Sequence, residues 1–421
     1  MSSMPSNHMD RDSHHEYNIV VVARGTSQGG ASMALRIIVF MPRRMRFGPS
    51  NATSIDMCVR DLVLASRYRA TTTVICCENE TLYTDVDVVT YPRSVDESTR
   101  KKVAFAAREV ERLGADLVVV QQHLPSAAQL ARRIDVPVVF HTHNMSRAIS
   151  RTSPMSWLRR YRYVRGYRSL RGLMVVSNVC RERFISNWPD VDRPVAVVPN
   201  GLDFSAWHPV DTRSNEILCV GRAAPEKGIW EAALAMEQVL GVYRNWTGRL
   251  VLAEPDTHPQ YMDSIDEIVA RAGGRITIEL SVPHARVQQC YEHAAIALIP
   301  SRWEEPFGRT GLEAHAGGCA VISSGTGGLA EIHGECALLL PKPFEAADIT
   351  ERLTQLINDP DLLARLARSG HARGRELFSI ETVSNVADNF YRRVIDSDST
   401  QTTPQQFHTD DGEYRVYGTA S

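Results

Sequence analysis

Two glutamates separated by seven residues are the side chains of this chain whose spacing most strongly suggests chemistry. Glu305 is followed by the turn residues Pro306-Phe307-Gly308, and Glu313 lies in an apolar-periodic run that favours a helix. The pattern predicts a loop carrying Glu305 and a helix carrying Glu313 about two turns from its start. The unpaired N–H groups and the dipole at such a helix start favour an anion such as phosphate. The carboxylates are therefore expected to accept hydrogen bonds from hydroxyls of a sugar or a ribose.

Three segments in order resemble the retaining glycosyltransferases of family 4, which have the GT-B fold. The segment from Pro300 to Glu331 contains the E-x7-E signature. Ile217 to Gly228 reads ILCVGRAAPEKG, similar to the family's strand followed by G-R-x-x-P-E-K-G. Val197 to Pro209 reads VVPNGLDFSAWHP, similar to its P-N-G-V-D segment between two domains. Three motifs in the family's order are far more specific than one.

The resemblance implies a binding site for a nucleotide-diphosphate sugar in the C-terminal half. Arg222 and Lys227 match the family's diphosphate-binding pair, in which an arginine grips phosphate oxygens in a planar fork and a lysine adds a compact charge. By the same resemblance Glu305 contacts hydroxyls of the donor sugar and Glu313 holds the ribose. The other implied donor-binding residues flank these groups and are Gly221, Phe307, Gly308, Arg309 and Thr310.

Two histidines end a strand-like run in the N-terminal half. Val138 to Asn144 reads VVFHTHN, in which His141 and His143 are two residues apart and so point to the same side of a strand. His143 matches the family's strand-end histidine that approaches the reacting sugar and the leaving group. The resemblance therefore implies that His143 is catalytic together with Arg222, Lys227 and Glu305, whereas a purely structural histidine is the alternative.

The resemblance also implies a mechanism without a protein nucleophile. In a front-face displacement the leaving phosphate takes the proton of the acceptor, assisted by Arg222 and Lys227. These two cations and the helix start at Gly308 already supply positive potential for a diphosphate. We therefore expect neither a metal ion nor a cofactor, with the nucleotide-diphosphate sugar as co-substrate.

The chain departs from the family on the acceptor side. The family commonly has a Gly-Gly-x-Glu loop after its first strand, and the corresponding piece here is Thr53 to Asp56, preceded by Gly48. Its hydroxyls are expected to cap a helix or to bond a phosphate. The acceptor-side candidates are Gly48, Thr53, Ser54 and His141. A second departure, at Ile278 to Pro283, leaves the identity of the base open.

Strands that alternate with helices predict an α/β protein of the GT-B type, with two Rossmann-like domains whose parallel sheets face a central cleft. We expect an acceptor domain at 35–199, a donor domain at 200–377 and a helix at 378–396 that crosses back to the acceptor domain. Residues 1–34 and 397–421 are polar and are expected to be disordered. The expected strands lie at 35–40, 73–76, 117–120, 136–140, 173–176, 217–220, 250–253, 276–279, 296–299 and 320–323.

The composition indicates a soluble cytoplasmic protein. Of 421 residues, 43% are hydrophobic and 23% are charged, as is ordinary for globular proteins. The eight cysteines are scattered without a C-x-x-C pair, which favours neither a zinc site nor a disulfide framework. The apolar runs are far shorter than the roughly 20 residues of a membrane-spanning helix.

Charge is unevenly distributed along the chain. Residues 1–200 carry 28 Lys and Arg against 18 Asp and Glu, and residues 136–181 contain no acid. Within that stretch, residues 157–171 interleave arginines with tryptophan and tyrosines, as in helices that lie on anionic membranes. The alternative is a solvated helix face packed by its aromatics. Nucleic acid is not expected, because the second half is acidic and no nucleic-acid motif is present.

The resemblance implies a hexosyltransferase that acts on a glycan or a lipid-linked envelope acceptor in polysaccharide or lipopolysaccharide biosynthesis, in the cytoplasm or peripherally at the inner membrane face. A metal-dependent GT-A transferase is an alternative, with Asp85-Val-Asp87 in a strand-like run or Asp190-Val-Asp192 as its D-x-D motif. A GT-B-fold epimerase or phosphorylase shares the expected architecture. A non-catalytic sugar-nucleotide-binding protein is the remaining alternative.

Overall fold

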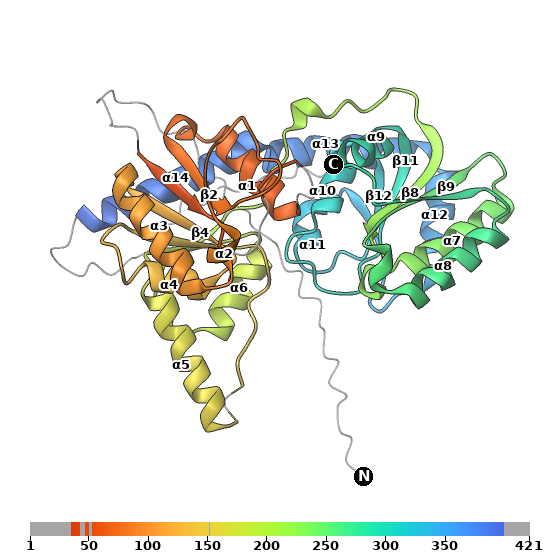
Figure 1. Cartoon of the computed structure of the whole chain (residues 1–421). Coiled ribbons are helices and arrows are strands. Elements are labelled where there is room, and N and C mark those ends of the chain that lie inside the picture. The colour runs from red at the N-terminus through yellow and green to blue at the C-terminus, as the bar shows by residue number, and fades with distance from the viewer. Residues whose placement is uncertain (1–34, 43–46, 50–52, 151, 400–421) are drawn as a thin grey trace, which may run out of the picture.

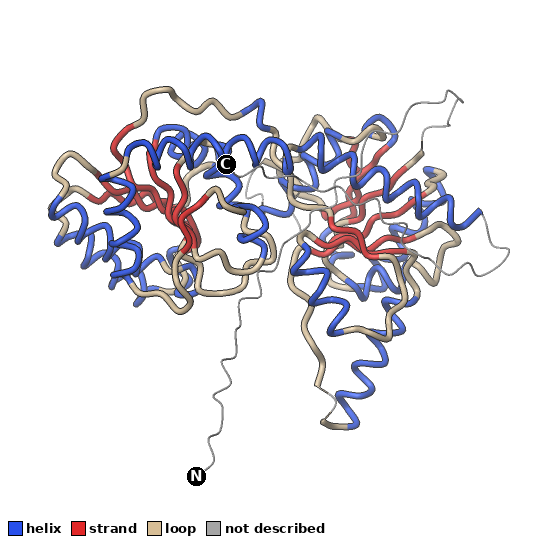
Figure 2. The backbone as a smooth tube through the Cα atoms, turned by 180° about the vertical axis from the view of Figure 1, so that it is seen from behind, coloured by secondary structure: helices blue, strands red, loops and turns tan. Residues whose placement is uncertain are grey.

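Two parallel β-sheets covered by helices form the chain (Figures 1 and 2). The computed structural model describes residues 35–42, 47–49, 53–150 and 152–399. The first sheet has seven strands in the order β3-β2-β1-β4-β5-β6-β7, and the second has six in the order β10-β9-β8-β11-β12-β13. The predicted α/β class with two Rossmann-like domains is confirmed.

The N-terminal sheet is buried on both faces, as parallel sheets usually are. Its strands are β1 (Ile37–Phe40), β2 (Thr72–Cys77), β3 (Asp87–Tyr91), β4 (Leu117–Gln121), β5 (Val138–Thr142), β6 (Gly172–Val175) and β7 (Val195–Val197). Its helices are α1 (Ser54–Ala65), α2 (Arg93–Asp96), α3 (Thr99–Leu113), α4 (Leu124–Leu130), α5 (Pro154–Arg168) and α6 (Asn178–Asn187). Every residue of the central strand β4 is buried, which explains the apolar run from Leu117 to Val120.

The C-terminal sheet repeats this architecture. Its strands are β8 (Ser214–Arg222), β9 (Thr247–Ala253), β10 (Ile276–Leu280), β11 (Ala294–Ile299), β12 (Ala320–Ser323) and β13 (Ala337–Leu339). Its helices are α7 (Ile229–Val242), α8 (Pro259–Arg271), α9 (His284–His293), α10 (Arg309–Ala316), α11 (Gly328–His333), α12 (Ala346–Asn358) and α13 (Pro360–Phe378). All ten predicted strands are present with bounds within three residues, and the edge strands β3, β7 and β13 were not among them.

The chain crosses between the domains twice, and the two crossings lie side by side. Leu202 N–H donates to Phe378 O at 3.0 Å, and Ile380 N–H donates to Leu202 O at 2.8 Å. Gly201 permits this approach, because a Cβ there would lie 3.0 Å from the Cα of Ile380. The last helix, α14 (Ile380–Ser399), then packs on the N-terminal core through Val383, Phe390 and Val394. One helix of the C-terminal end thus belongs to the N-terminal domain.

The two acidic triplets serve structural roles. Asp85 forms an ion pair with Arg60, and Asp87 accepts a hydrogen bond from Thr73 Oγ1 at 2.6 Å within the sheet. Asp190 forms an ion pair with Arg160 at 2.6 Å. The two-sheet architecture contradicts the GT-A alternative.

Candidate active site

Lys227 and Glu305 come together at the carboxyl edge of the C-terminal sheet. Strands β8 and β11 are neighbours, so the segments that follow them emerge side by side. Lys227 ends the short 3-10 helix Pro225–Lys227 after β8, and Glu305 lies in the loop after β11. Lys227 Nζ is 2.6 Å from Glu305 Oε1, and Ser301 Oγ donates to the same oxygen at 2.8 Å. Lys227 and Glu305, which were predicted from separate motifs, therefore form an ion pair at this edge of the sheet.

A glycine fixes this approach. Gly228 has a left-handed backbone with φ of +66°, and a Cβ at this position would collide with the carbonyl oxygen of Pro300. The loop after β8 consequently rests on the end of β11, where Arg302 N–H donates to Glu226 O at 2.8 Å. Lys227 is held over Glu305 by backbone geometry as well as by charge.

Arg222 stands at the same edge as the last residue of β8, directly after Gly221. Its Nη2 is 3.0 Å from Glu226 Oε1, and its Nη1 is 3.8 Å from Glu254 Oε2. The side chain is 40% exposed, so the guanidinium is accessible to a ligand. Both contacts are with partly exposed carboxylates, which an incoming phosphate can displace at low cost.

The predicted helix start at Gly308 is confirmed as the beginning of α10. Gly308 has φ of +98°, and a Cβ there would collide with Leu329. The buried ring of Phe307 packs 5.7 Å from that of Phe378 and anchors the turn. Arg309 and the half-buried Thr310 form the first turn of α10, whose N–H groups have no carbonyl within the helix to bond. This helix start lies directly after the loop that carries Glu305.

Glu313 is the fifth residue of α10, so it lies just past the first turn and not two turns in as predicted. It is buried, and its Oε1 accepts hydrogen bonds from Arg309 Nε at 2.8 Å and His284 Nε2 at 2.9 Å. Burial raises the pKa of the Glu313 carboxyl, but the hydrogen bond from His284 and the charge of Arg309 outweigh it and lower the pKa. Glu313 is therefore an ionised acceptor.

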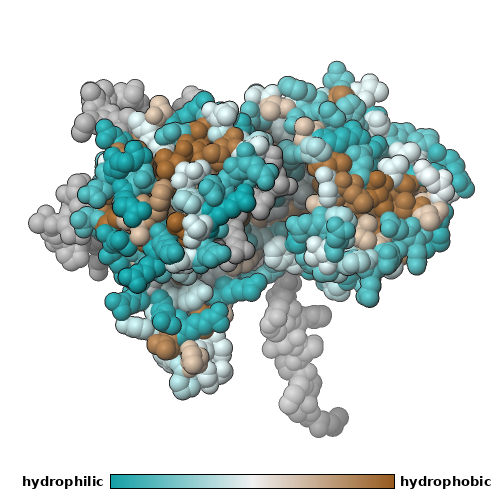
Figure 3. Space-filling model, viewed as in Figure 1, coloured by the Kyte–Doolittle hydropathy of each residue, from teal (hydrophilic) through white to brown (hydrophobic). Residues whose placement is uncertain are grey.

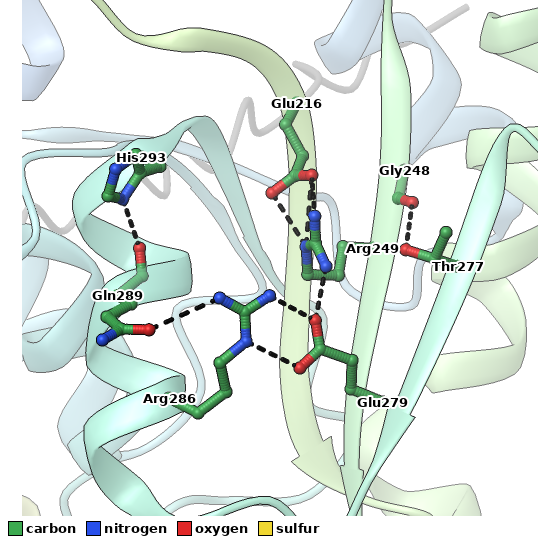
Figure 4. Close-up of polar contacts among 8 residues, drawn as sticks. All are labelled: Glu216, Gly248, Arg249, Thr277, Glu279, Arg286, Gln289 and His293. Atoms are coloured by element: carbon green, nitrogen blue, oxygen red, sulfur yellow. Dashed lines mark hydrogen bonds and ion pairs between the residues drawn. The ribbon is translucent and has the colours of Figure 1, made fainter.

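Figure 4 shows the network that holds the helix carrying His284. Arg286 donates two hydrogen bonds to Glu279, from Nη2 at 2.7 Å and from Nε at 2.9 Å. Arg249 bridges the same Glu279 to Glu216 on β8. The hydrogen bonds from Arg286 lower the pKa of Glu279 to about 2. Helix α9, which begins with His284, is thereby tied to strands β8, β9 and β10.

The Arg309 side chain connects the two domains. In addition to Glu313, its guanidinium contacts Cys58 Sγ at 3.0 Å and Asp61 Oδ2 at 3.7 Å on α1. The side chain is only 11% exposed. The Arg309 side chain therefore positions Glu313 against α1. Only the backbone N–H of Arg309 is left to contact a ligand.

The N-terminal domain contacts the Glu305 loop through α6. Ser177, the residue that caps α6, donates from Oγ to Pro306 O at 2.6 Å. Glu331 of α11 accepts hydrogen bonds from the N–H groups of Asn178 at 2.9 Å and Val179 at 2.8 Å. The end of β6 and the residue after Glu305 thus lie against each other.

His143 and His141 lie on the same side of β5, as predicted, with ring centroids 4.2 Å apart. His143 contacts Asn200 Oδ1 through Nδ1 at 3.1 Å and Gln121 Oε1 through Nε2 at 3.2 Å. Burial lowers the pKa of His143 to about 4, so the ring is neutral at pH 7. A neutral imidazole donates through one nitrogen only, so one of the two amides presents its NH2 group to the ring.

His141 differs from its neighbour. Both of its ring nitrogens are buried without a hydrogen-bond partner among the residues that the structure describes. Burial lowers the pKa of His141 well below its ordinary value, and His143 adds to this effect. His141 therefore packs as a neutral ring behind His143.

Thr53 and Ser54, which were expected on the acceptor side, lie at the start of α1. Thr53 is the capping residue and donates to Asp56 Oδ2 from its N–H at 2.8 Å and from Oγ1 at 2.7 Å. The exposed Ser54 follows it. Gly48 is buried against the backbone of Thr81, so its missing Cβ serves chain packing. The adjoining residues 43–46 and 50–52 lie outside the described residues.

Two partners of the predicted residues carry no motif signal. His284 follows Pro283 in the segment that departs from the family, and Gln121 ends β4 without a recognisable pattern. Within the described ranges, no group of three or more His, Cys, Asp or Glu could hold a metal ion. The same part of the chain contains no helix of the length and apolarity needed to cross a membrane.

Two family models match adjoining parts of the chain. The model described as "Glycosyltransferase Family 4" matches residues 58–206, and the model described as "Glycosyl transferases group 1" matches residues 203–373. The chain is 28% identical over 204 residues to a glycogen synthase of Mycobacterium tuberculosis, covering 47% of this chain and 48% of that protein. It is 29% identical over 237 residues to an MMP alpha-(1->4)-mannosyltransferase of Mycolicibacterium hassiacum, covering 54% and 55%. These alignments span about half the length of the relatives.

Solved structures share the architecture. The sucrose-phosphate synthase of Thermosynechococcus elongatus superposes with a TM-score of 0.69 at 21% identity, covering 86% of this chain and 100% of that chain. HepE of Anabaena in complex with UDP and glucose superposes with a TM-score of 0.67 at 18% identity, covering 85% and 100%. At such identities the likeness concerns the fold. Together with the two family matches, it shows that the chain belongs to the GT-B glycosyltransferases of the family 4 type.

Proposed function

We propose that this chain is a retaining hexosyltransferase that moves a hexose from a nucleotide-diphosphate sugar to a hydroxyl of a glycan or lipid-linked acceptor. The observation that carries the proposal is the bond between Lys227 Nζ and Glu305 Oε1 at 2.6 Å, beside Arg222 and the start of α10. A diphosphate needs cations and free N–H groups, and a hexose needs a buried carboxylate that accepts from its hydroxyls. Both requirements meet at this edge of the sheet.

In this proposal the donor separates the ion pair. A phosphate oxygen replaces Glu305 at Lys227, and a sugar hydroxyl replaces Lys227 at Glu305. Arg222 exchanges its exposed glutamate partners for the second phosphate. Glu313, held ionised by His284 and Arg309, accepts from the ribose hydroxyls. Lys227 and Arg222 thus exchange a carboxylate for a phosphate, Glu305 exchanges an ammonium donor for a hydroxyl donor, and Glu313 keeps its protein partners.

The proposed reaction retains the anomeric configuration. The bond between the sugar carbon and the leaving phosphate oxygen breaks while the acceptor oxygen bonds to that carbon from the same face. The acceptor proton passes to the leaving phosphate oxygen, so no protein base is required. Arg222, Lys227 and the N–H groups of α10 stabilise the negative charge that develops on the diphosphate. A divalent ion is not needed for this task.

We propose a positioning role for His143 toward the reacting sugar. Its ring is neutral and braced by Gln121 and Asn200, and Asn200 lies at the first crossing between the domains. A braced neutral imidazole can donate one hydrogen bond, or accept one, without bringing a charge that would compete with the cations. The ring of His141 packs against the ring of His143 and supports its position.

The relatives suggest which acceptors to try. One of them is named a lipopolysaccharide core biosynthesis mannosyltransferase, of Rhizobium leguminosarum, and is 26% identical over 217 residues. We propose that this chain also acts on a carbohydrate acceptor of polysaccharide or lipopolysaccharide biosynthesis. A cytoplasmic location with peripheral attachment to the inner membrane face fits such an acceptor.

A thermal-shift screen of UDP-, GDP- and ADP-sugars tests the donor site. A ligand present at 100 times its dissociation constant stabilises the folded protein by about 2.7 kcal/mol. With the best donor, release of free nucleoside diphosphate that depends on an added acceptor indicates transfer. Binding without release indicates a sugar-nucleotide-binding protein, and release of a sugar phosphate or an epimerised donor indicates a phosphorylase or epimerase. The anomeric configuration of the product, read by NMR, tests retention.

A further inference from the structure

We propose that the end of α5 docks onto an anionic lipid bilayer through an apolar tip surrounded by arginines. The proposal deepens the proposed function, and rests on it only in assigning the surface to a lipid-linked acceptor. Binding itself depends on α5 alone. The tip is defined as residues 154–162, the first nine residues of the helix.

Helix α5 projects from the N-terminal domain (Figure 1). Its second half is anchored, because Gly166 packs on Ala128 of α4 and the Tyr163 ring stacks on Trp188 with centroids 5.6 Å apart. Arg160 is also held there, with Nη1 donating to Asn187 O at 2.8 Å. The residues before Arg160 extend beyond this anchor into solvent.

Apolar side chains gather at the tip. Met155 is 75% exposed, Trp157 55%, Leu158 52% and Tyr161 61%. They are four of the nine large hydrophobic residues that are exposed among the described residues, although they lie within seven positions of one another. Figure 3 shows brown and pale residues together at the end of this lobe. Scattered exposed hydrophobics are ordinary, but a cluster on a projecting element indicates an interaction site.

Arginines surround the apolar cluster. Arg159, Arg162 and Arg165 are exposed on α5, and none of them forms an ion pair with another described residue. Arg160 is an exception within the arginine-rich stretch predicted from the sequence, because it is buried and paired with Asp190. The three exposed guanidinium groups are therefore available to an external anion.

The pattern fits a bilayer better than other occupants. Interfacial helices bury Trp and Leu side chains about 5–10 Å into the headgroup boundary while Arg contacts the lipid phosphates. A second copy of this chain would bring two sets of arginines together, and residues 136–181 contain no acid to neutralise them. A nucleic acid would use the arginines but would leave Met155 and Leu158 in water. An anionic membrane surface satisfies the apolar and the cationic groups together.

The tip is also connected to the candidate active site. The segment that follows His143 at the end of β5 runs alongside α5 to its tip (Figures 1 and 2). Ser146 on this segment is held by Trp188 Nε1, which donates to Ser146 Oγ at 2.7 Å, and by Asn187. A bilayer bound at the tip would therefore lie at one end of a segment whose other end is His143.

Sedimentation with lipid vesicles tests the proposal. The protein is expected to pellet with phosphatidylglycerol vesicles at low salt, to bind less at high salt, and not to pellet with phosphatidylcholine vesicles. Arg159→Glu with Arg162→Glu should weaken binding at least tenfold, since each basic residue contributes about 1 kcal/mol near an anionic surface. The matched control is Arg365→Glu with Arg368→Glu, two exposed arginines of α13 at the same spacing, which should bind like wild type.

A second pair of variants tests the apolar part. Met155→Ser with Leu158→Ser should weaken vesicle binding several-fold even at low salt, whereas Val242→Ser, at a 72% exposed position elsewhere, should not. Unchanged binding of either tip variant, or no binding of wild type at low salt, overturns the proposal. Dimers that the Met155 and Leu158 changes dissociate would assign the tip to a second copy. Binding to a generic oligonucleotide that survives those same changes would assign it to nucleic acid.

The two proposals fail separately in these assays. The α5 variants lie outside the donor site, so they should retain the thermal shift given by the best sugar nucleotide. If no donor binds to any variant while vesicles still bind to wild type, the proposed function fails and the docking surface stands. If a donor binds but wild type does not bind vesicles, the docking surface fails and the proposed function stands.

Discussion

Lys227 and Glu305 are 78 positions apart in the sequence, yet Lys227 Nζ lies 2.6 Å from Glu305 Oε1. The pair exists because β8 and β11 are adjacent parallel strands and because Gly228 lets the first loop rest on the second. Without a donor, each charge neutralises the other. A donor must displace this bond in order to bind, so the separation of Lys227 from Glu305 reports donor binding.

The first prediction concerns this pair. Lys227→Ala and Glu305→Ala should each abolish transfer, with kcat/KM lowered at least about 1,000-fold, because one removes a phosphate cation and the other the acceptor for sugar hydroxyls. Circular dichroism should show an unchanged fold, since both side chains lie at the edge of the sheet. The matched control is Glu304→Ala, which removes an exposed carboxylate paired with Arg183. Near wild-type turnover of either site variant would remove the site assignment.

The second prediction concerns the support of Glu313. His284→Ala should raise KM for the donor about tenfold while changing kcat little, because it removes a hydrogen bond that keeps Glu313 ionised and oriented. His293→Ala serves as control, since His293 is an exposed residue of the same helix. A loss confined to kcat would contradict a role in ribose binding and would point to the reacting atoms instead.

These two sites show what the sequence could and could not predict. Lys227, Glu305 and the start of α10 lie in contiguous motifs whose turn residues determine the local backbone, so they could be placed in advance. The partner of Glu313 could not, because His284 lies 29 positions away on another helix and follows a segment without a motif. Arg309 was expected to bind donor, but its side chain turns toward Cys58 on the other domain, a contact that only the tertiary fold creates.

The same contrast holds for the fold. Strands such as β4 are buried on both faces and read as continuous apolar runs, so their positions were predicted within three residues. Strands β7 and β13 have three residues each and partly exposed patterns, and such short edge strands carry little periodic signal. Arg160 was predicted to lie on the surface with the other arginines of residues 157–171. The sequence does not show that Trp188 and Asp190 contact Arg160 in the folded chain.

The third prediction concerns pH and His143. The folded pKa of about 4 lies below the ordinary value of about 6.5, so between these values the unfolded chain binds a proton that the folded chain does not. Protonation of His143 in the unfolded chain therefore lowers the free energy of unfolding at acidic pH. The effect is absent above pH 6.5 and grows as the pH falls toward 4, reaching about 2 kcal/mol between pH 7 and pH 5. His143→Gln should therefore show a smaller fall in Tm over that interval than wild type.

The control for this measurement is His293→Gln, at an exposed histidine outside the domain junction. It should reproduce the wild-type pH dependence. His315, whose pKa burial lowers to about 3, contributes to stability in the same direction in all of these proteins, so only the difference between variants reports on His143. An imidazole NMR titration of His143 with a midpoint above pH 6 would contradict its burial as a neutral ring.

The last prediction concerns metal ions. Arg222, Lys227 and the start of α10 together supply the positive potential that a diphosphate leaving group requires, so transfer should keep its rate in excess chelator. If these groups replace a metal, then removing one of them should create a partial metal requirement. Arg222→Ala should lose at least tenfold in kcat, and added magnesium should restore part of that loss while leaving the wild-type rate unchanged. Wild-type activity that vanishes with chelator and returns only with magnesium or manganese would refute the assignment of charge stabilisation to these residues.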